Sequence, residues 1–278
     1  MIEPLKQHEF EKIRDLLESV CGIVLKPDQD YLVETRLTEL ANEIGAKDFG
    51  ELHRYIISDE SLLPKVVDLM TTNETLWFRD DSCWLTVESV ILPELISKME
   101  NGQPKIRVWS AASSTGQEAY SLVMTIMEYL ERHGKPEMAK RFEIVATDIS
   151  SAAVYIARRG TYDPFTISRG MSDSRKQKYF EKEQHAWTLK DEIKERVEFR
   201  VFNLMDNFVS LGIFDLVFCR NVAIYFSEEF KKELFAKIGR ILTPNGYMLL
   251  GASESLFGIK TDFENLSFGN GLYYRIRK

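Results

Sequence analysis

Apolar residues recur at helical spacing in the first quarter of the chain. Between residues 1 and about 75 they repeat every three or four positions, which predicts amphipathic helices. The four sets are Phe10, Ile13, Leu16, Leu17 and Val20; Val33, Leu37, Leu40 and Ile44; Phe49, Leu52, Tyr55 and Ile56; and Val66, Val67, Leu69 and Met70. Since no strand pattern occurs there, we predict an all-helical domain over residues 1–75.

A further helix is predicted at 80–98, and from residue 106 onward short apolar runs alternate with helical patterns. The predicted strands are 106–111, 142–147, 197–202, 214–219 and 247–251, and residues 266–276 contain an Asn-Gly turn typical of a hairpin. Helices are predicted to end near 132–134, to span 151–159, and to run from Ser227 to a stop at Asn245-Gly246. This alternation predicts an α/β domain over 76–278 with a mostly parallel sheet.

The connection formed by residues 160–196 is much longer than the usual link of about two to six residues. One interpretation is a disordered surface loop. The other is a small folded insert at about 161–196, and aromatic residues such as Tyr162, Phe180 and Trp187 favour it.

Composition narrows the class of protein. The chain is 44% hydrophobic and 28% charged, as expected for a folded domain, and its net charge of −7 argues against a nucleic-acid-binding surface. No apolar run approaches the roughly 18 residues that span a bilayer, and the N-terminus lacks a signal-peptide pattern. Three scattered cysteines and four scattered histidines indicate a cytoplasmic protein with no metal site.

Polar residues follow the predicted strands where a parallel sheet binds its ligands, beyond the carboxyl ends. They are 110–116 after the first strand, Asp148, Asn203, and Arg220-Asn221. Asp148 could accept hydrogen bonds from the ribose hydroxyls of an adenosine-containing ligand, or it could serve as a turn residue or helix cap.

The turn at 110–116, after the first predicted strand, limits which class of ligand could bind. It has one glycine, so it does not match the glycine-rich loops that bind pyrophosphate, and no Walker loop is present. Glu118, two residues into the following helix, would repel a pyrophosphate and attract a cation. The turn therefore favours a positively charged nucleoside without phosphate, namely S-adenosylmethionine, although Glu118 could also simply complement the helix dipole.

The polar segment 71–79 contains aromatic residues and an arginine next to Thr and Asn residues, whose side chains often hydrogen-bond to their own backbone. From the residues alone, it is either a linker that caps the next helix or part of a site.

Four motifs together resemble the chemotaxis receptor glutamate methyltransferases, the CheR family. They are TNETLWFR at 72–79, STGQEAYS at 114–121, ATDIS at 146–150 and CRNVAIYF at 219–226, in this order. The resemblance covers essentially the whole chain. It implies an all-α N-terminal domain followed by a Rossmann-like S-adenosylmethionine-dependent methyltransferase domain with a small inserted β-subdomain.

The resemblance also implies an activity and a site. Enzymes of this family transfer a methyl group from S-adenosylmethionine to glutamates of the cytoplasmic helical region of chemoreceptors, giving γ-methyl esters and S-adenosylhomocysteine, with no metal. The implied cofactor contacts are Asn73, Thr75, Arg79, Glu118, Asp148, Asn203, Leu204, Arg220 and Asn221. Tyr225 would lie near the transferred methyl, and the segment 71–79 becomes part of the site.

The chemistry needs few catalytic groups. A glutamate carboxylate, with a pKa near ~4.3, is already ionised at neutral pH and needs no base. Catalysis then consists of positioning and desolvation, so no histidine or cysteine nucleophile is expected. We expect Arg79 to orient the incoming carboxylate and Tyr225 to shape the methyl site.

Two features depart from the family pattern. The predicted second helix, within 27–46, has Arg36 as its only basic residue among five acidic ones, which weakens attraction to an acidic receptor on that face. The stretch 180–197 is short, so we expect no strong binding of a receptor C-terminal pentapeptide. Two alternatives stay open: methylation of a signalling protein other than a chemoreceptor, and a methyltransferase-like regulatory or binding module in a non-chemotaxis pathway.

Overall fold

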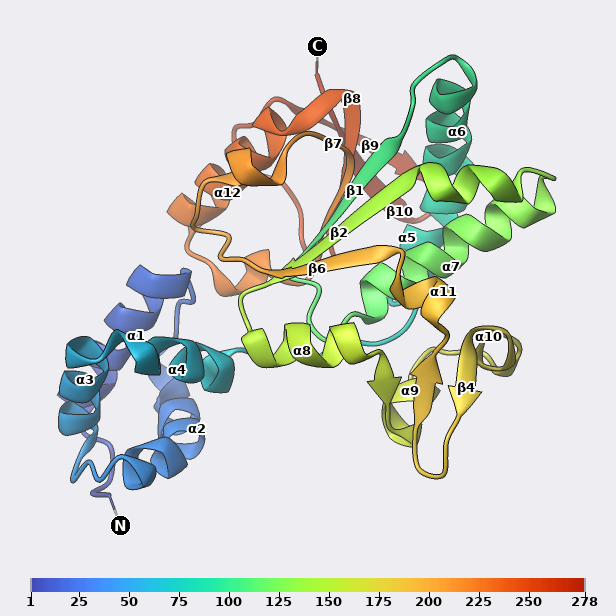
Figure 1. The fold of residues 1–278 in the computed structure, drawn as a ribbon. Helices are drawn as coiled ribbons and strands as arrows, with labels where there is room; N and C mark the ends of the chain where they lie inside the picture. Colours follow the sequence, from blue (N-terminus) through green and yellow to red (C-terminus); the bar gives the residue numbers. More distant parts are fainter. Residues whose placement is uncertain (1, 278) are drawn as a thin grey trace.

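The computed structural model describes residues 2–277 and begins with four helices packed on one another (Figure 1). They are α1 (Gln7–Cys21), α2 (Asp30–Glu43), α3 (Phe49–Ser58) and α4 (Leu63–Met70). Their apolar stripes form a core of their own, in which Ile13, Val33 and Leu37 are fully buried. Gly22 ends α1 in the left-handed conformation, at φ 74°, which suits a residue without Cβ. The prediction of an all-helical N-terminal region is confirmed.

The rest of the chain is built around a seven-stranded sheet. Its strands are β1 (Ile106–Ala111), β2 (Phe142–Asp148), β6 (Val197–Val201), β7 (Phe214–Cys219), β8 (Leu242–Leu249), β9 (Phe263–Phe268) and β10 (Gly271–Ile276). Their order is β6-β2-β1-β7-β8-β10-β9. The first five in this order are parallel, and β10 and β9 add the predicted antiparallel hairpin at one edge.

Helices cover both faces of this sheet, as the alternation predicts (Figure 1). One face carries α5 (Asp81–Thr86), α6 (Leu92–Glu100), α7 (Gln117–Arg132) and α8 (Ser151–Arg159). The other carries α12 (Glu228–Arg240), which Ser227 caps by accepting a bond from the Phe230 amide. Successive residues of β1 point to opposite faces of the sheet. Val108 packs in the core under α5–α8, and Trp109 packs with Phe208 and Phe214 in the core under α12.

The helix predicted at 80–98 is present as a continuous helical run over 81–100 and contains a π-helical turn, Val87–Ile91. One predicted boundary is wrong. The helix predicted to stop at Asn245-Gly246 ends earlier, at Arg240, because Leu242 already pairs with Phe214 in the sheet. Asn245, at φ 60°, bends the chain inside β8 instead of ending a helix.

The long connection is a folded insert and not a disordered loop. It contains β3 (Thr161–Tyr162), α9 (Pro164–Ser168), α10 (Asp173–Tyr179), β4 (Phe180–Lys182), β5 (Trp187–Leu189) and α11 (Asp191–Lys194). The three strands form a separate antiparallel sheet in the order β3-β5-β4. Trp77 packs edge-on against Tyr162 and Phe180, with ring centroids 5.0 and 5.4 Å apart, so the insert lies on the segment that links α4 to α5. The domain limits at 75/76 and 161–196 stay predictions.

Within residues 2–277, no helix is long and apolar enough to cross a membrane.

Candidate active site

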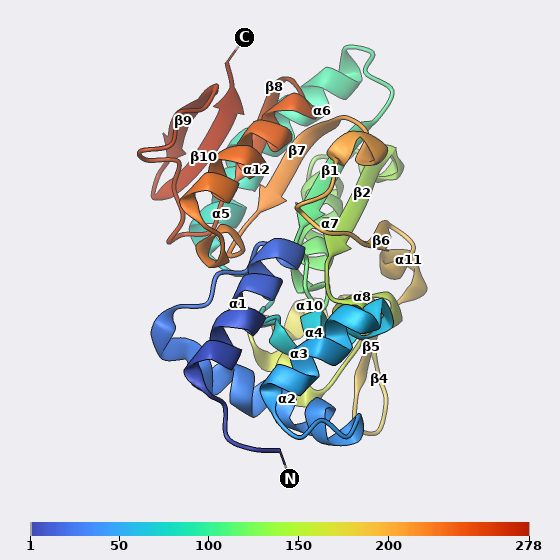
Figure 2. The same ribbon diagram turned by 90° about the vertical axis from the view of Figure 1, so that its left-hand side faces the viewer.

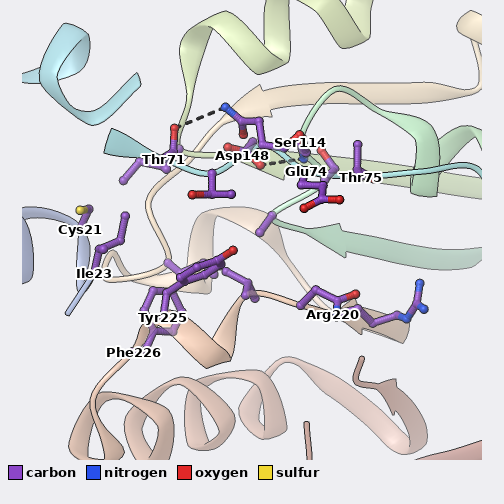
Figure 3. Close-up of a pocket in the computed structure, with 18 of the residues that line it drawn as sticks. Cys21, Ile23, Thr71, Glu74, Thr75, Ser114, Asp148, Arg220, Tyr225 and Phe226 are labelled. Atoms are coloured by element: carbon purple, nitrogen blue, oxygen red, sulfur yellow. Dashed lines mark hydrogen bonds between the residues drawn. The ribbon is translucent and has the colours of Figure 1, made fainter. Parts of the chain in front are cut away.

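A pocket lies between the N-terminal helices and the carboxyl ends of the parallel strands (Figure 3). Figure 2 shows the N-terminal helices beside that end of the sheet. It brings together all of the site residues predicted from the sequence: Asn73, Thr75, Arg79, Glu118, Asp148, Asn203, Leu204, Arg220, Asn221 and Tyr225. These residues come from five separate stretches of chain, and the sheet topology places four of them at one edge.

Asp148, at the end of β2, holds the turn that follows β1. Its two carboxylate oxygens accept hydrogen bonds from the amides of Ser114 (2.7 Å) and Ser150 (2.9 Å). Burial raises the pKa of the Asp148 carboxyl above its ordinary value, and these two amides act in the opposite direction. Since a carboxylate offers about four acceptor positions, Asp148 keeps capacity to accept from a ligand. Asp148 is therefore a turn residue that also faces the pocket.

Arg220, at the end of β7, is the most buried charged side chain of the pocket, with 1% of its side chain exposed. Its guanidinium donates to Glu118 (2.8 Å), to Asp80 (2.6 Å) and to the backbone carbonyl of Arg79 (2.8 Å). Glu118 accepts a further bond from the Ser110 hydroxyl at 2.8 Å. The arginine thus fixes Glu118 in the pocket wall. Sequence reasoning identified neither of its carboxylate partners, Glu118 and Asp80.

The segment 71–80 is both the linker from α4 to α5 and one wall of the pocket. Phe78 and Asp80 adopt left-handed backbone conformations, at φ 48° and 66°. The Phe78 amide donates to the Ser121 hydroxyl at 3.1 Å, and the Asn73 carbonyl accepts from the Ser114 hydroxyl at 3.2 Å. Arg79 lines the pocket, and its side chain enters no ion pair within residues 2–277, so its charge has no carboxylate partner there.

Arg36, the only basic residue of α2, does not act as a free surface charge. Its guanidinium donates to the carbonyls of Met70 (2.8 Å) and Thr71 (3.3 Å) and to the Thr72 hydroxyl (3.2 Å). It therefore satisfies the last carbonyls of α4 and fixes the start of the segment 71–80.

The N-terminal helices supply a wall that sequence reasoning missed. The chain after α1 crosses to the loop after β7, where the Val24 amide donates to the Tyr225 carbonyl at 2.9 Å and Ile23 pairs with Phe226. The Asn203 side chain donates to the Val20 carbonyl at 2.7 Å. No local pattern encodes these contacts, because their partners lie about 200 residues apart in the chain.

The chemistry of the pocket fits S-adenosylmethionine. Three carboxylates, Glu74, Glu118 and Asp148, line it, and its turn lacks the glycines that let backbone approach a pyrophosphate. Cys21 also lines it, but burial raises the pKa of this thiol to about 11, so it stays protonated at neutral pH. Among the described residues, no group of three or more His, Cys, Asp or Glu is arranged to hold a metal ion.

Comparison with known proteins identifies the family. Residues 8–71 match the model of the CheR methyltransferase all-alpha domain, and residues 73–271 match that of its SAM binding domain. The chain belongs to the CheR methyltransferase family. It is therefore an S-adenosylmethionine-dependent methyltransferase, with the two-part organisation that the four motifs predict.

Full-length relatives agree with this assignment. The chain is 44% identical to chemotaxis protein methyltransferase 1 of Pseudomonas aeruginosa, over 97% of this chain and 98% of the relative. It is 43% identical to chemotaxis protein methyltransferase Cher2 of Pseudomonas putida, with the same coverage. A chemotaxis protein methyltransferase of Vibrio parahaemolyticus is 41% identical over 98% of both chains. This CheR-family enzyme thus acts in chemotaxis.

Proposed function

We propose that this enzyme methylates glutamate side chains in the cytoplasmic helical region of chemoreceptors, forming γ-methyl esters. The observation that carries the proposal is an arginine, Arg79, that has no carboxylate partner among residues 2–277 and lines the same pocket as the Glu118–Arg220 pair. A site for a carboxylate substrate needs such a charge. The family and its chemotaxis relatives support the choice of receptor.

The pocket residues divide into two groups by chemistry. S-adenosylmethionine, when bound, supplies a methyl group on a positively charged sulfur. Glu118 is the carboxylate suited to the positive end of this molecule, and Asp148 has acceptor positions for ribose hydroxyls. Asn73, Thr75, Arg79, Asn203, Leu204, Arg220 and Asn221 complete the proposed cofactor contacts. Arg220 contributes through Glu118, to which its guanidinium donates, while its buried Nε–H has no protein partner among residues 2–277.

Arg79 and Tyr225 have the proposed catalytic roles. A glutamate is ionised at neutral pH, so the enzyme needs only to hold it in line and exclude water. Arg79 orients it by a charge-assisted hydrogen bond, and Tyr225 shapes the methyl site. The Tyr225 backbone is held by Val24, so the N-terminal region contributes directly to the position of this side chain.

Two proposals concern location and docking. A receptor's cytoplasmic region requires a cytoplasmic enzyme, and the three free cysteines fit that compartment.

The docking surface is proposed to lie away from α2. The Arg36 guanidinium donates to the Met70 carbonyl at the end of α4, so α2 has no basic side chain free to reach an acidic receptor, and docking uses another surface.

A methyl-transfer assay tests the function. We expect label from methyl-labelled S-adenosylmethionine to enter the receptor-containing membrane fraction and to be released by mild base, because carboxyl esters hydrolyse easily. Base-stable label, or label in other signalling proteins only, would contradict the receptor-glutamate proposal. No transfer at all, with intact cofactor binding, would favour the regulatory-module alternative.

Arg79→Ala tests the orienting role. Losing a charge-assisted hydrogen bond of about 1.5–3 kcal/mol corresponds to a fall of roughly 10- to 100-fold in kcat/KM for receptor. Calorimetry should still detect S-adenosylmethionine binding. The matched control is Arg132→Ala, which removes an exposed pair with Glu88 and should change kcat/KM less than about twofold. An unchanged kcat/KM in the Arg79 variant would refute the role.

The insert is proposed not to bind a receptor C-terminal pentapeptide strongly. Its strands β4 and β5 are three residues each and are joined by only four residues, 183–186, which leaves little surface for a peptide. Titration calorimetry with such a peptide should show no saturable binding at micromolar concentrations. Tight, saturable heat would overturn this proposal.

A further inference from the structure

Glu254 is a buried carboxylate that lies outside the pocket and accepts hydrogen bonds from the loop after β7. It follows β8 and is 8% exposed. Its oxygens accept hydrogen bonds from three backbone amides: Asn221 (2.6 Å), Val222 (3.1 Å) and Gly251 (2.8 Å). Glu254 itself does not line the pocket, but two of its partners, Asn221 and Val222, do.

The amides that Glu254 holds belong to the loop after β7. Arg220 precedes them, and the short helix Ala223–Tyr225 follows, so the loop carries both the buried guanidinium and the proposed methyl-site tyrosine. Asn221 has φ 58°, a left-handed conformation that costs a non-glycine residue free energy. A charge-assisted bond to its amide from a buried carboxylate offsets that cost and selects this conformation.

Gly251 makes the close approach possible. A Cβ at this position would lie 2.5 Å from the Asn221 side-chain nitrogen and 2.8 Å from a Glu254 oxygen. Even the smallest side chain would therefore push the carboxylate and the loop apart. The contact between Glu254 and the loop can thus be disrupted by substituting either Glu254 or Gly251.

We propose that Glu254 is a positioning residue for methyl transfer, which sets the conformation of the loop 220–225 and thereby the position of Tyr225. This inference rests on the proposed function, in which Tyr225 borders the transferred methyl. Glu254 acts on that side chain through the backbone of Asn221 and Val222. A carboxylate suits this position better than an amide would, because all three partners are N–H donors.

Glu254→Gln is the direct test. Glutamine keeps one oxygen and replaces the other by an NH2 group, so at least one of the two loop amides, Asn221 or Val222, should lose its acceptor. We expect hydrogen exchange of the peptide covering 219–226 to accelerate at least tenfold, measured without cofactor. We expect kcat to fall at least tenfold and the Kd of S-adenosylhomocysteine to change by a smaller factor, because Arg220 keeps its own partners, Glu118 and Asp80, while Asn221 moves with the loop. Gly251→Ala, which displaces the same contact, should give both effects if Glu254→Gln folds poorly.

Asp215→Asn is the matched control. Asp215 is a buried carboxylate, 3% exposed, near the opposite end of β7, where it accepts from the Arg107 amide (2.9 Å) and from Gln103 and Thr243 side chains. Its loss should lower the Tm without changing exchange in 219–226, and kcat should stay within twofold. Equal kcat losses in the Asp215 and Glu254 variants would show a merely structural role and refute the proposal.

A double variant separates the inference from the proposed function. On a Tyr225→Ala background, Glu254→Gln should lower kcat less than threefold further, because both changes act on one group. Two results would overturn the positioning role. One is that Glu254→Gln lowers kcat as much on the Tyr225→Ala background as it does alone. The other is that hydrogen exchange in 219–226 is unchanged in both Glu254→Gln and Gly251→Ala. If Tyr225→Ala alone leaves kcat unchanged, the proposed methyl site is wrong, and the exchange result still decides whether Glu254 sets the loop.

Discussion

The pocket depends on one buried guanidinium. Arg220 joins the end of β7, the first turn of α7 through Glu118, and the segment 71–80 through Asp80 and the Arg79 carbonyl. Burial of an unpaired charge costs several kcal/mol, so the folded state requires both carboxylates to stay close. The same requirement places a carboxylate in the pocket wall, where a cationic nucleoside can use it. Stability and ligand chemistry are therefore coupled at this residue.

Backbone strain is concentrated in the loops that form the pocket. Within residues 2–277, five of the six non-glycine residues with positive φ belong to these loops: Phe78, Asp80, Ala112, Ser114 and Asn221. Such conformations persist only where surrounding contacts enforce them. Here the contacts are Arg220 with the segment 71–80, and Asp148 with the amide of Ser114. The N-terminal helices add to them through Val24 and Tyr225, so they are part of the site as well as a separate core.

Much of this fold could be predicted from the sequence, since local patterns encode it. The limits of β1, α8 and β7 match the predicted ranges, because each is marked by apolar spacing and by a cap or turn. The α12–β8 junction could not be predicted, because a tertiary pairing of Leu242 with Phe214 overrides the Asn-Gly stop signal. The strand-end rule and the family motifs predicted the pocket residues. They could not give the partners of Arg220, Arg36 or Asn203, which lie tens to hundreds of residues away and carry no local signal.

The central claim is that Arg220 holds the cofactor wall together, and calorimetric titration of the Arg220→Met variant with S-adenosylhomocysteine tests it most directly. The account predicts at least a tenfold weaker Kd than wild type, together with a loss of unfolding free energy of about 3–5 kcal/mol. Arg200→Met, which breaks the exposed pair with Glu198, should keep Kd within twofold and cost less than about 1 kcal/mol. A folded Arg220→Met protein that binds with wild-type affinity would contradict the account.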